Sequence, residues 1–388
     1  MSMRKRYRQQ PDIYTSMMQE MVESVDWYRF LERARLPVAG SDAADLLRDK
    51  SILVTGAGGS IGSSLALRLN ELSPRKLILL EASESHLHEL QLRLDPNSSG
   101  TCDAACYLGS VRDEALLDEI FVQHRPEWIY HAAAHKHVSL LEDHPLAGLT
   151  NNVLGTEAVS ARAESMGSRM VLLSTDKAAA PASMMGATKR VAELIVLANG
   201  GVVVRLGNVL ASRGSVVETF TRQIAHGGPV TITDPEAARF WLTVEESCEL
   251  LISAVTEVGE DAGEAVLLVP ELAQRRTVGE LAMFMMKELA PHQEISVKVT
   301  GLKAGEKKLE VLWTDEEDIT AISRGGLRRI CTHPMTRTQL YPGLHELRQT
   351  IGARDLQGAV ATLESLVPGY FASQRVWTSS ASSGPVMV

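Results

Sequence analysis

The chain has 388 residues, of which 45% are hydrophobic and 22% charged, and its formal net charge at pH 7 is −9. This length and composition are those of a globular protein with room for two domains and a sizeable core, which excludes a disordered or collagen-like chain. The acidic balance argues against a general nucleic-acid binder, which would need a basic footprint.

The first 50 residues are predicted to form an N-terminal helical extension and a linker. Residues 12–36 carry apolar side chains at helical spacing, which predicts one or two amphipathic helices packed on the main domain or on a second subunit. Residues 37–50 contain a proline, a glycine and a polar run, as is typical of a linker. The basic side chains before residue 10 are interpreted as a solvated tail, since no apolar signal region follows them and they are few for a membrane-surface contact.

From residue 51 onward, short apolar runs alternate with segments of helical periodicity. The apolar runs predict strands at 51–56, 76–81, 104–108, 127–133, 170–175 and 201–207. Nearly continuous apolar strands that alternate with helices form parallel sheets covered on both faces. We therefore expect an α/β fold, a doubly wound parallel sheet of Rossmann type, over residues 51–207. A further apolar run at 265–270 is expected to rejoin this sheet.

The rhythm becomes irregular after residue 207, and residues 208–370 are predicted to form mainly a smaller α+β substrate-binding domain. The run at 229–233 is typical of a hairpin strand, and a helix is expected at 243–258. Such material appended to a nucleotide-binding sheet usually supplies the pocket of the other substrate. The end of the chain, residues 371–388, is predicted to be a disordered tail.

A glycine-rich turn, TGAGGSIG at 55–62, joins the first predicted strand to a helix. Glycines permit the tight turn and let the backbone approach a pyrophosphate, and the helix N-terminus offers N–H groups and a positive dipole to the phosphates. In this context the motif predicts a dinucleotide site rather than a purely structural turn. Glu81 ends the second strand, where its carboxylate can accept hydrogen bonds from an adenosine ribose and would repel a 2′-phosphate. NAD is therefore favoured over NADP.

A second group of chemistry-bearing residues lies at the end of the fifth predicted strand, where sites of α/β proteins gather. Thr175, Asp176 and Lys177 are consecutive there. The Asp–Lys pair could be a structural ion pair that caps the segment after the strand. The functional interpretation is that the two side chains act as acid and base in catalysis. Met185 and Lys189 follow on one helix face, where a tyrosine would be expected in place of the methionine. Methionine cannot carry a proton, so either another group acts or the protein is inactive.

A series of colinear motifs between about residue 50 and residue 315 carries a resemblance to a known family. They are TGAGGSIG, HAAAHKHV (131–138), NNVLGT (151–156), STDKAAAP (174–181), MGATKR (185–190), GNVLASRGSV (207–216), GGPVTIT (227–233), RFWLT (239–243) and AGEKKLE (304–310). The chain resembles the extended short-chain dehydrogenases/reductases and, more narrowly, the nucleotide-sugar 4,6-dehydratases of the CapD type of polysaccharide biosynthesis proteins. That branch includes members with methionine in the tyrosine position, so Met185 is interpreted as membership of the branch.

The resemblance implies a redox-neutral lyase reaction on a UDP-N-acetylhexosamine, above all UDP-N-acetylglucosamine. NAD would take a hydride from C4, the C5 proton and the C6 hydroxyl would leave as water, and the hydride would return to C6, giving UDP-2-acetamido-2,6-dideoxy-hexos-4-ulose. It implies proton transfer at O4 or the C6 hydroxyl by Asp176 and removal of the C5 proton by Lys177. Thr175 would orient O4, and Lys189 would hold the nicotinamide ribose.

The resemblance also implies sets of binding residues. Cofactor contacts are expected from Gly56, Gly59, Ser60, Ile61, Gly62, Glu81, Ser110, Val111, Ala132, Ala133, Lys136 and Lys189. Substrate contacts are expected from Lys136, Asn208, Ser215, Arg239 and Glu306. Arg239 suits the pyrophosphate. The chain departs from the family at Ser110, where an aspartate is usual beside the adenine, and at Lys303–Ala304, which replace an Arg–Pro pair.

Other functions stay open: a UDP-hexosamine epimerase or C4 oxidoreductase on the same scaffold, or a catalytically silent NAD-binding protein. Dehydration is favoured because a simple 4-epimerase needs neither a base at C5 nor an acid for the C6 hydroxyl.

The expected partners are a UDP-sugar and at least one further copy of the chain, with no nucleic acid and no integral membrane segment. The spacing of the four cysteines favours reduced thiols in a cytoplasm, and no metal is expected at the histidines of 131–144.

Overall fold

The computed structural model describes residues 21–22, 24–94, 103–257, 265–322, 324–331 and 335–379. In these residues the core is a nine-stranded sheet with the strand order β14-β15-β11-β6-β5-β4-β1-β2-β3. The strands are β1 Ser51–Thr55, β2 Lys76–Glu81, β3 Asp103–Leu108, β4 Trp128–His131, β5 Arg169–Thr175, β6 Val202–Leu206, β11 Val266–Pro270, β14 Asp318–Ile322 and β15 Leu327–Cys331. All neighbours from β3 to β11 pair in parallel, and β15 and β14 extend the edge in antiparallel orientation. The predicted doubly wound parallel sheet is confirmed.

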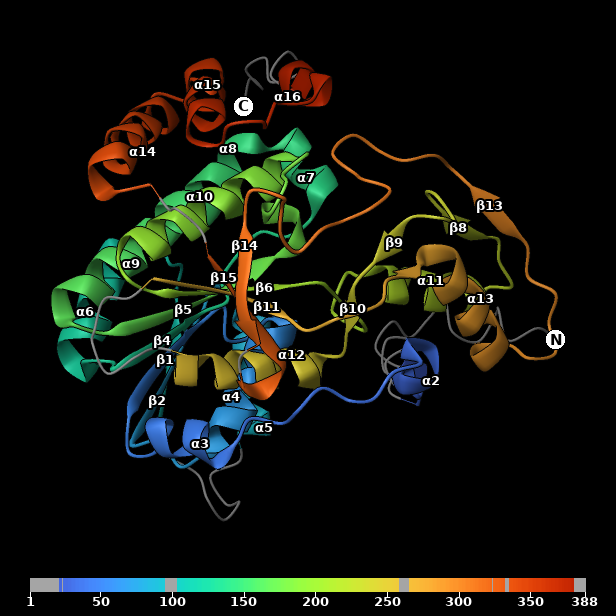
Figure 1. Cartoon of the computed structure of the whole chain (residues 1–388), viewed down its shortest axis with the longest axis horizontal. Helices are drawn as coiled ribbons and strands as arrows, with labels where there is room; N and C mark the ends of the chain where they lie inside the picture. The colour runs from blue at the N-terminus through green and yellow to red at the C-terminus, as the bar shows by residue number, and fades with distance from the viewer. Residues whose placement is uncertain are drawn as a thin grey trace.

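Helices cover both faces of this sheet (Figure 1). They are α4 Ser60–Glu71, α5 Glu84–Arg93, α6 Glu114–His124, α9 Gly155–Met166, α10 Met184–Ala198 and α12 Val244–Ser253. Every residue of β1 is buried, because an apolar strand in the middle of a covered parallel sheet has neighbours on both faces. Within the described ranges, none of the helices is long and apolar enough to cross a membrane.

A smaller α+β region lies beside the sheet, on the right of Figure 1. It contains α11 Val216–Ala225, β8 Val230–Ile232, α13 Val278–Leu289 and β13 Val297–Val299, with the short strands β7 Asn208–Val209, β9 Ala238–Arg239, β10 Trp241–Leu242 and β12 Arg276–Thr277. The prediction of a hairpin strand at 229–233 is wrong, because β8 pairs in parallel with β13. A partner more than sixty residues away leaves no local turn signal in the sequence.

Residues 208–370 are divided between this region and the main sheet. β11 pairs in parallel with β6, at the place where the run 265–270 was expected to rejoin, and β15 then pairs with β11. Helix α12 packs against α4 of the glycine-rich turn. An open edge of β6 would leave backbone hydrogen-bonding groups unpaired, and these later strands satisfy them.

The N-terminal extension contains two short helices, α2 Trp27–Leu31 and α3 Ser41–Leu47. The ring of Phe30 lies 6.1 Å from Trp241 and 5.5 Å from Phe284, so α2 packs on the smaller region. The prediction that 37–50 is a linker is wrong for α3, because Ala43 and Leu47 are buried in the main core. The basic tail and the first part of the helical pattern at 12–36 lie outside the described residues.

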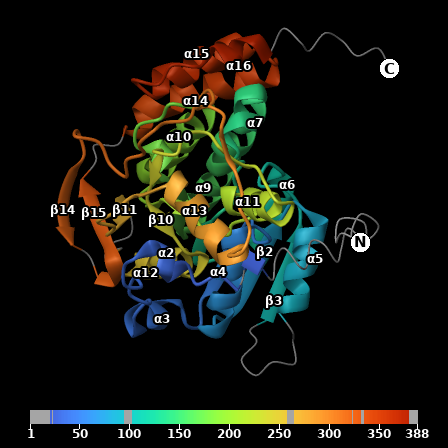
Figure 2. The ribbon, with the colours of Figure 1, turned by 90° about the vertical axis from the view of Figure 1, so that its right-hand side faces the viewer.

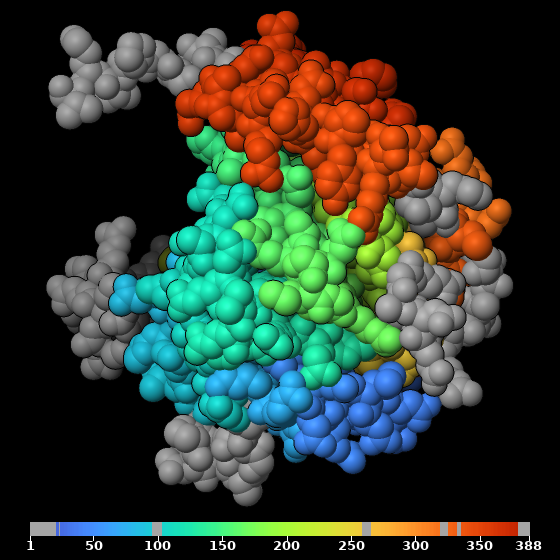
Figure 3. Space-filling view, turned by 90° about the vertical axis from the view of Figure 1, so that its left-hand side faces the viewer, coloured from blue at the N-terminus to red at the C-terminus, as the bar shows by residue number. Residues whose placement is uncertain are grey.

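The C-terminal helices α14 Arg337–Gly352 and α15 Leu356–Leu366 cover the outer face of α10. Figures 2 and 3 show them in orange and red over the green elements. Their apolar side chains form one buried cluster with those of α10, including Leu344 and Leu363 opposite Val191 and Ile195. This face of α10 is therefore closed within the same chain, and the homo-oligomer expected from the sequence stays a prediction.

The prediction of a disordered tail from residue 371 is wrong for its first part. Helix α16, Gln374–Ser379, packs on α7, Val138–Asp143. Val376 is buried, and the guanidinium of Arg375 donates two hydrogen bonds of 2.5 Å to the carboxylate of Asp143. These tertiary contacts order a segment whose serine-rich composition is typical of a tail. Residues 380–388 lie outside the described residues.

Candidate active site

The glycine-rich turn between β1 and α4 is too tight for side chains. Gly56 has φ of 65°, and a Cβ atom on it would lie 2.7 Å from the Cα atom of Ala133. A Cβ atom on Gly62 would lie 2.1 Å from the carbonyl oxygen of Gly56. No side chain caps α4, whose first residues are the predicted cofactor contacts Ser60 and Ile61. The bare turn and uncapped helix N-terminus fit the phosphates of a dinucleotide.

Glu81 lies directly against this turn. Its side chain is buried, and its Oε2 atom accepts a hydrogen bond of 2.8 Å from the N–H of Gly58. Its Oε1 atom accepts one of 2.9 Å from the N–H of Ser83. These bonds fix the carboxylate at the end of β2, beside the loop, where the acidic residue of a dinucleotide site binds the ribose.

The other predicted cofactor residues follow the neighbouring strands. The N–H of Ala132 donates to the carbonyl of Thr55 over 3.1 Å, which holds the small residues after β4 beside the turn. Ser110 follows β3, and its hydroxyl accepts hydrogen bonds from the backbone and side chain of Arg112. Val111 is buried against Gly155 of α9. All of them lie at the carboxyl edge of the parallel strands, where ligands of this fold bind.

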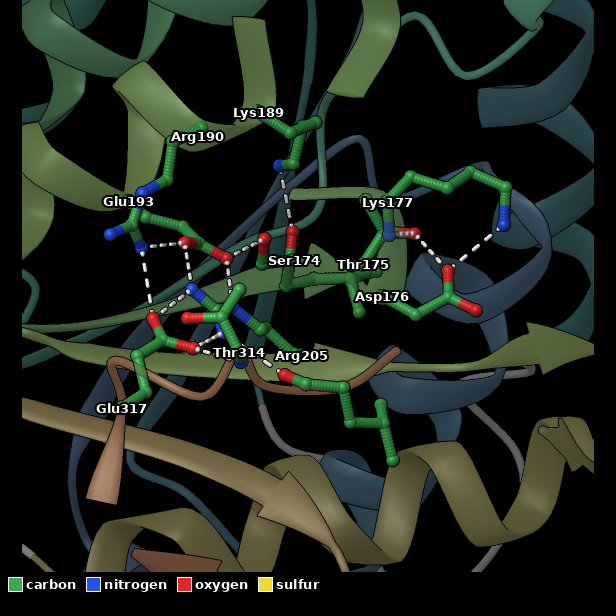
Figure 4. Close-up of polar contacts among 12 residues, drawn as sticks. Ser174, Thr175, Asp176, Lys177, Lys189, Arg190, Glu193, Arg205, Thr314 and Glu317 are labelled. Atoms are coloured by element: carbon green, nitrogen blue, oxygen red, sulfur yellow. Dashed lines mark hydrogen bonds and ion pairs between the residues drawn. The ribbon is translucent and has the colours of Figure 1, made fainter. Parts of the chain in front are cut away.

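Thr175, Asp176 and Lys177 form a polar cluster at the end of β5 (Figure 4), to which Asn208 also belongs. The Oδ1 atom of Asp176 accepts hydrogen bonds of 2.9 Å from the Thr175 hydroxyl and from the Lys177 ammonium. The same ammonium donates to Oδ1 of Asn208 over 2.9 Å. The Oδ2 atom of Asp176 is buried and has no hydrogen-bond partner among the described residues. An orphaned carboxylate oxygen is costly in a folded protein, which marks it as a candidate functional group.

Met185 and Lys189 lie one turn apart on α10, and both side chains are buried. Lys189 is 5% exposed and donates a hydrogen bond of 2.8 Å to the carbonyl oxygen of Leu173 on β5. Burial lowers the pKa of Lys189 to about 8, although the carboxylate of Glu193 opposes the shift. Met185 belongs to the apolar cluster that α10 shares with the C-terminal helices. The structure thus places the lysine next to the strand that carries Asp176.

The predicted substrate residues are arranged in two groups. Lys136 lies 3.5 Å from the hydroxyl of Ser212, in the loop that follows β7, and Asn208 is the first residue of β7. Burial lowers the pKa of Lys136. Ser215 begins α11, and its hydroxyl is buried with no hydrogen-bond partner in the described part of the chain.

Arg239, on β9, and Glu306 form the second group, at the segment 303–310. The buried guanidinium of Arg239 donates to the backbone carbonyls of Ala238, Lys307 and Lys308. Two of these bonds hold residues 307–308, and two of the five N–H groups of Arg239 make no hydrogen bond within the described part of the chain. Glu306 is half-buried and accepts a hydrogen bond from the N–H of Lys303, within its own turn. Lys307 donates to the carbonyl of Ala180 over 2.6 Å, so the smaller region touches the loop after Asp176.

Asn152 is a positioning residue that the sequence reasoning missed. It lies in the π-helix Leu149–Leu154, and its side chain exchanges two hydrogen bonds with the backbone of His135, of 2.8 and 3.0 Å. It also donates to the Thr188 hydroxyl of α10 over 3.1 Å. Asn152 therefore ties the cofactor-side loop after β4 to the helix of Lys189. The motif NNVLGT contained the signal, namely two amides within an otherwise apolar helical pattern.

His131 is a satisfied polar group between two strands and a helix. Its ring nitrogens lie 2.7 Å from the Thr55 hydroxyl and 3.0 Å from the Thr156 hydroxyl. Burial, with a smaller contribution from the Lys189 charge, lowers the pKa of His131 to about 3, so the ring is neutral at pH 7. Among the described residues, no group of three or more His, Cys, Asp or Glu side chains is arranged to hold a metal ion.

The parallel sheet, the glycine turn and the polar cluster at the strand ends define a protein of the doubly wound, Rossmann-type class. The family described as "Polysaccharide biosynthesis protein" matches residues 52–331, and the chain belongs to this family.

Among its relatives is the capsular polysaccharide biosynthesis protein CapD of Staphylococcus aureus, 36% identical over 280 residues, or 70% of this chain and 46% of that protein. The chain thus spans about half the length of this relative. A protein of Rickettsia prowazekii named UDP-glucose 4-epimerase is 30% identical and is matched over 73% of this chain and 83% of its own. The solved structure of Pen from Bacillus thuringiensis has a TM-score of 0.64 and 26% identity, over 70% of this chain and 84% of that chain.

Proposed function

We propose that the protein catalyses NAD-dependent 4,6-dehydration of UDP-N-acetylglucosamine to UDP-2-acetamido-2,6-dideoxy-hexos-4-ulose. The observation that carries this proposal is the buried Oδ2 atom of Asp176, which has no hydrogen-bond partner in the described ranges and lies beside Lys177 at the carboxyl end of β5. A 4,6-dehydration needs acid and base groups next to each other, and these two side chains are of the required kinds. Membership of a polysaccharide biosynthesis family supports a nucleotide-sugar substrate.

In this proposal Asp176 moves the proton at O4 or at the C6 hydroxyl. Its Oδ1 atom is held by Thr175 and Lys177, which leaves Oδ2 to meet a sugar hydroxyl. Thr175 orients O4 through its hydroxyl, which already lies 2.9 Å from the carboxylate. Proton transfer between groups at hydrogen-bond distance contributes a factor of about 10²–10⁴ to the rate.

Lys177 takes the proton from C5. Its ammonium lies between the carboxylate of Asp176 and the amide oxygen of Asn208, so both its orientation and its distance are set before a sugar binds.

The cofactor proposed is NAD, which would accept and return the hydride. The glycine turn and the N-terminus of α4 would hold its pyrophosphate, and Glu81 would accept hydrogen bonds from its adenosine ribose. A 2′-phosphate would face the Glu81 carboxylate, so NADP is disfavoured. Lys189 would exchange its bond with the Leu173 carbonyl for one with the nicotinamide ribose.

The test is incubation of the purified protein with UDP-N-acetylglucosamine in D₂O, followed by mass spectrometry and proton NMR. Loss of one water with deuterium at C5 is the expected result. Lys177→Met is expected to abolish C5 exchange, whereas Asp176→Asn is expected to block every step from the first. No loss of water in the wild-type protein would overturn the dehydratase assignment.

The second candidate is a UDP-hexosamine epimerase or C4 oxidoreductase. The relative named UDP-glucose 4-epimerase favours it, since the match covers most of both chains. The same experiment separates the candidates, because an epimer of unchanged mass would appear without deuterium at C5. Bound NAD with no change in any sugar would instead support a silent binding protein.

A further inference from the structure

The loop that follows β7 connects the smaller region to the glycine turn. Its centre is Arg213, whose N–H donates a hydrogen bond of 2.8 Å to the hydroxyl of Ser60 at the start of α4. One Nη1 donor of Arg213 lies 3.2 Å from the carbonyl oxygen of Gly58 in the turn itself. The other arm, Nη2, lies 2.6 Å from both carboxylate oxygens of Glu89 on α5.

The rest of this loop packs against the segment that follows β4, which is predicted to contact the cofactor. Gly214 has φ of 69°, and a Cβ atom on it would lie 2.7 Å from the ring of His137, just beyond β4. Lys136 contacts Ser212. The loop therefore runs from Asn208, in the cluster at the end of β5, to the glycine turn, and contacts of Ser212, Arg213 and Gly214 hold it in place.

Arg213 and Glu81 approach the same residue of the turn from two sides. Glu81 accepts the N–H of Gly58, and Arg213 donates to its carbonyl. The guanidinium thus lies at the adenosine-ribose end of the turn, where the fold admits a dinucleotide. Arg213 lies within the motif GNVLASRGSV (207–216) and is not among the residues predicted to bind cofactor or substrate.

We propose that Arg213 and Glu89 form an ionic clasp that closes over the bound dinucleotide and slows its release. The inference rests on the proposed function only for the identity of the cofactor. A redox-neutral reaction returns the hydride within each turnover, so the cofactor has no need to leave. The side chains of Arg213 and Glu89 are 39% and 46% exposed, so the clasp is weak enough to open and sensitive to salt.

The experiment measures the release rate of NADH by stopped-flow fluorescence after a chase with excess NAD⁺, without any sugar present. Arg213→Ala is expected to release NADH about tenfold faster, since it loses the ion pair and the bond to Gly58. Glu89→Gln keeps the shape and loses only the charge, and its release rate is expected to rise about three- to fivefold. Salt at about 0.5 M screens exposed ion pairs. It should raise the NADH release rate of the wild type towards that of Glu89→Gln and leave the release rate of Arg213→Ala unchanged.

Arg68→Ala is the matched control. Arg68 lies on α4 and, like Arg213, pairs with glutamates, here Glu71 and Glu249; within the described residues these ion pairs involve no atom of the glycine turn. Its release rate should equal that of the wild type. Equal NADH release rates in the wild type, Arg213→Ala and Glu89→Gln would overturn the clasp. So would variants that bind NADH more weakly only because they associate with it more slowly, with an unchanged release rate. A wild-type protein that binds no dinucleotide would instead overturn the proposed function together with the clasp.

Discussion

Two polar clusters lie side by side at the end of β5, and they differ in how completely their charges are paired (Figure 4). The closed cluster comprises Glu193, Arg205, Glu317 and Arg190, and Ser174 donates to it over 2.6 Å. The open cluster comprises Thr175, Asp176, Lys177 and Asn208.

In the closed cluster every carboxylate oxygen has a partner. Arg205 is fully buried and donates two hydrogen bonds to each of Glu193 and Glu317, of 2.7 to 2.9 Å. These charges lower the pKa of Glu193 to about 2 and raise that of Arg205. In the open cluster one oxygen of a fully buried carboxylate has no partner within the described part of the chain. Of the two groups of charges near the end of β5, the saturated one thus stabilises the fold, and the one with an unpaired oxygen is the candidate for chemistry.

The largest effect is expected in the open cluster. Asp176→Asn keeps the side-chain volume and removes the carboxylate, so kcat with UDP-N-acetylglucosamine should fall by about 10²–10⁴-fold. The melting temperature should stay within a few degrees of the wild type, because the asparagine oxygen can accept the hydrogen bonds made to Oδ1, and the atom replaced, Oδ2, has no partner among the described residues. A large loss of stability with residual activity would show that Asp176 belongs with the structural charges.

The next effect is expected in the closed cluster. Glu193→Gln leaves Arg205 buried with one carboxylate fewer, which should cost about 3–5 kcal/mol in the free energy of unfolding measured with urea. Glu71→Gln is the control, since its exposed pair with Arg68 should contribute less than about 1 kcal/mol. A loss as small as that of the control would contradict the structural role of the cluster.

The pH dependence of stability should report His131, another saturated buried group. Its folded pKa of about 3 lies below the ordinary value of about 6.5, so between these values only the unfolded chain binds the proton. Stability should therefore fall by about 1.4 kcal/mol per pH unit as pH drops below 6.5, from this group alone. Urea unfolding at several pH values should show a shallower slope for His131→Gln. Parallel slopes in the two proteins would contradict the assignment.

The smallest effects should separate two neighbours on β5. Thr175→Val removes the hydrogen bond to Asp176 and should lower kcat about tenfold without changing stability. Ser174→Ala removes the bond to Glu193 and should lower the free energy of unfolding by about 1 kcal/mol with kcat near that of the wild type. Steady-state kinetics and urea unfolding of both variants measure this contrast, and the reverse pattern would overturn the comparison.

The sheet was predictable because its signals are local. The apolar runs from β1 to β6 and the helical segments between them can each be recognised within a few consecutive residues. The glycines of the turn likewise stand where a Cβ atom would clash with the neighbouring backbone. Asp176 and Lys177 could be placed at a strand end for the same reason. The helix α3 within the supposed linker and the helix α16 within the supposed tail could not, because Leu47 and Val376 become core residues only after distant elements surround them.

The sequence by itself thus determined the alternation of strands and helices, the phosphate turn and the residue types at the end of β5. Only the tertiary structure decided which charges meet. Arg205 lies in an apolar strand, and its partner Glu317 is 112 residues away. Arg213 and Glu89 are separated by 124 residues. Periodicity encodes the conformation of a segment, whereas the pairing of its side chains depends on which segments the topology makes neighbours, and no local pattern records that.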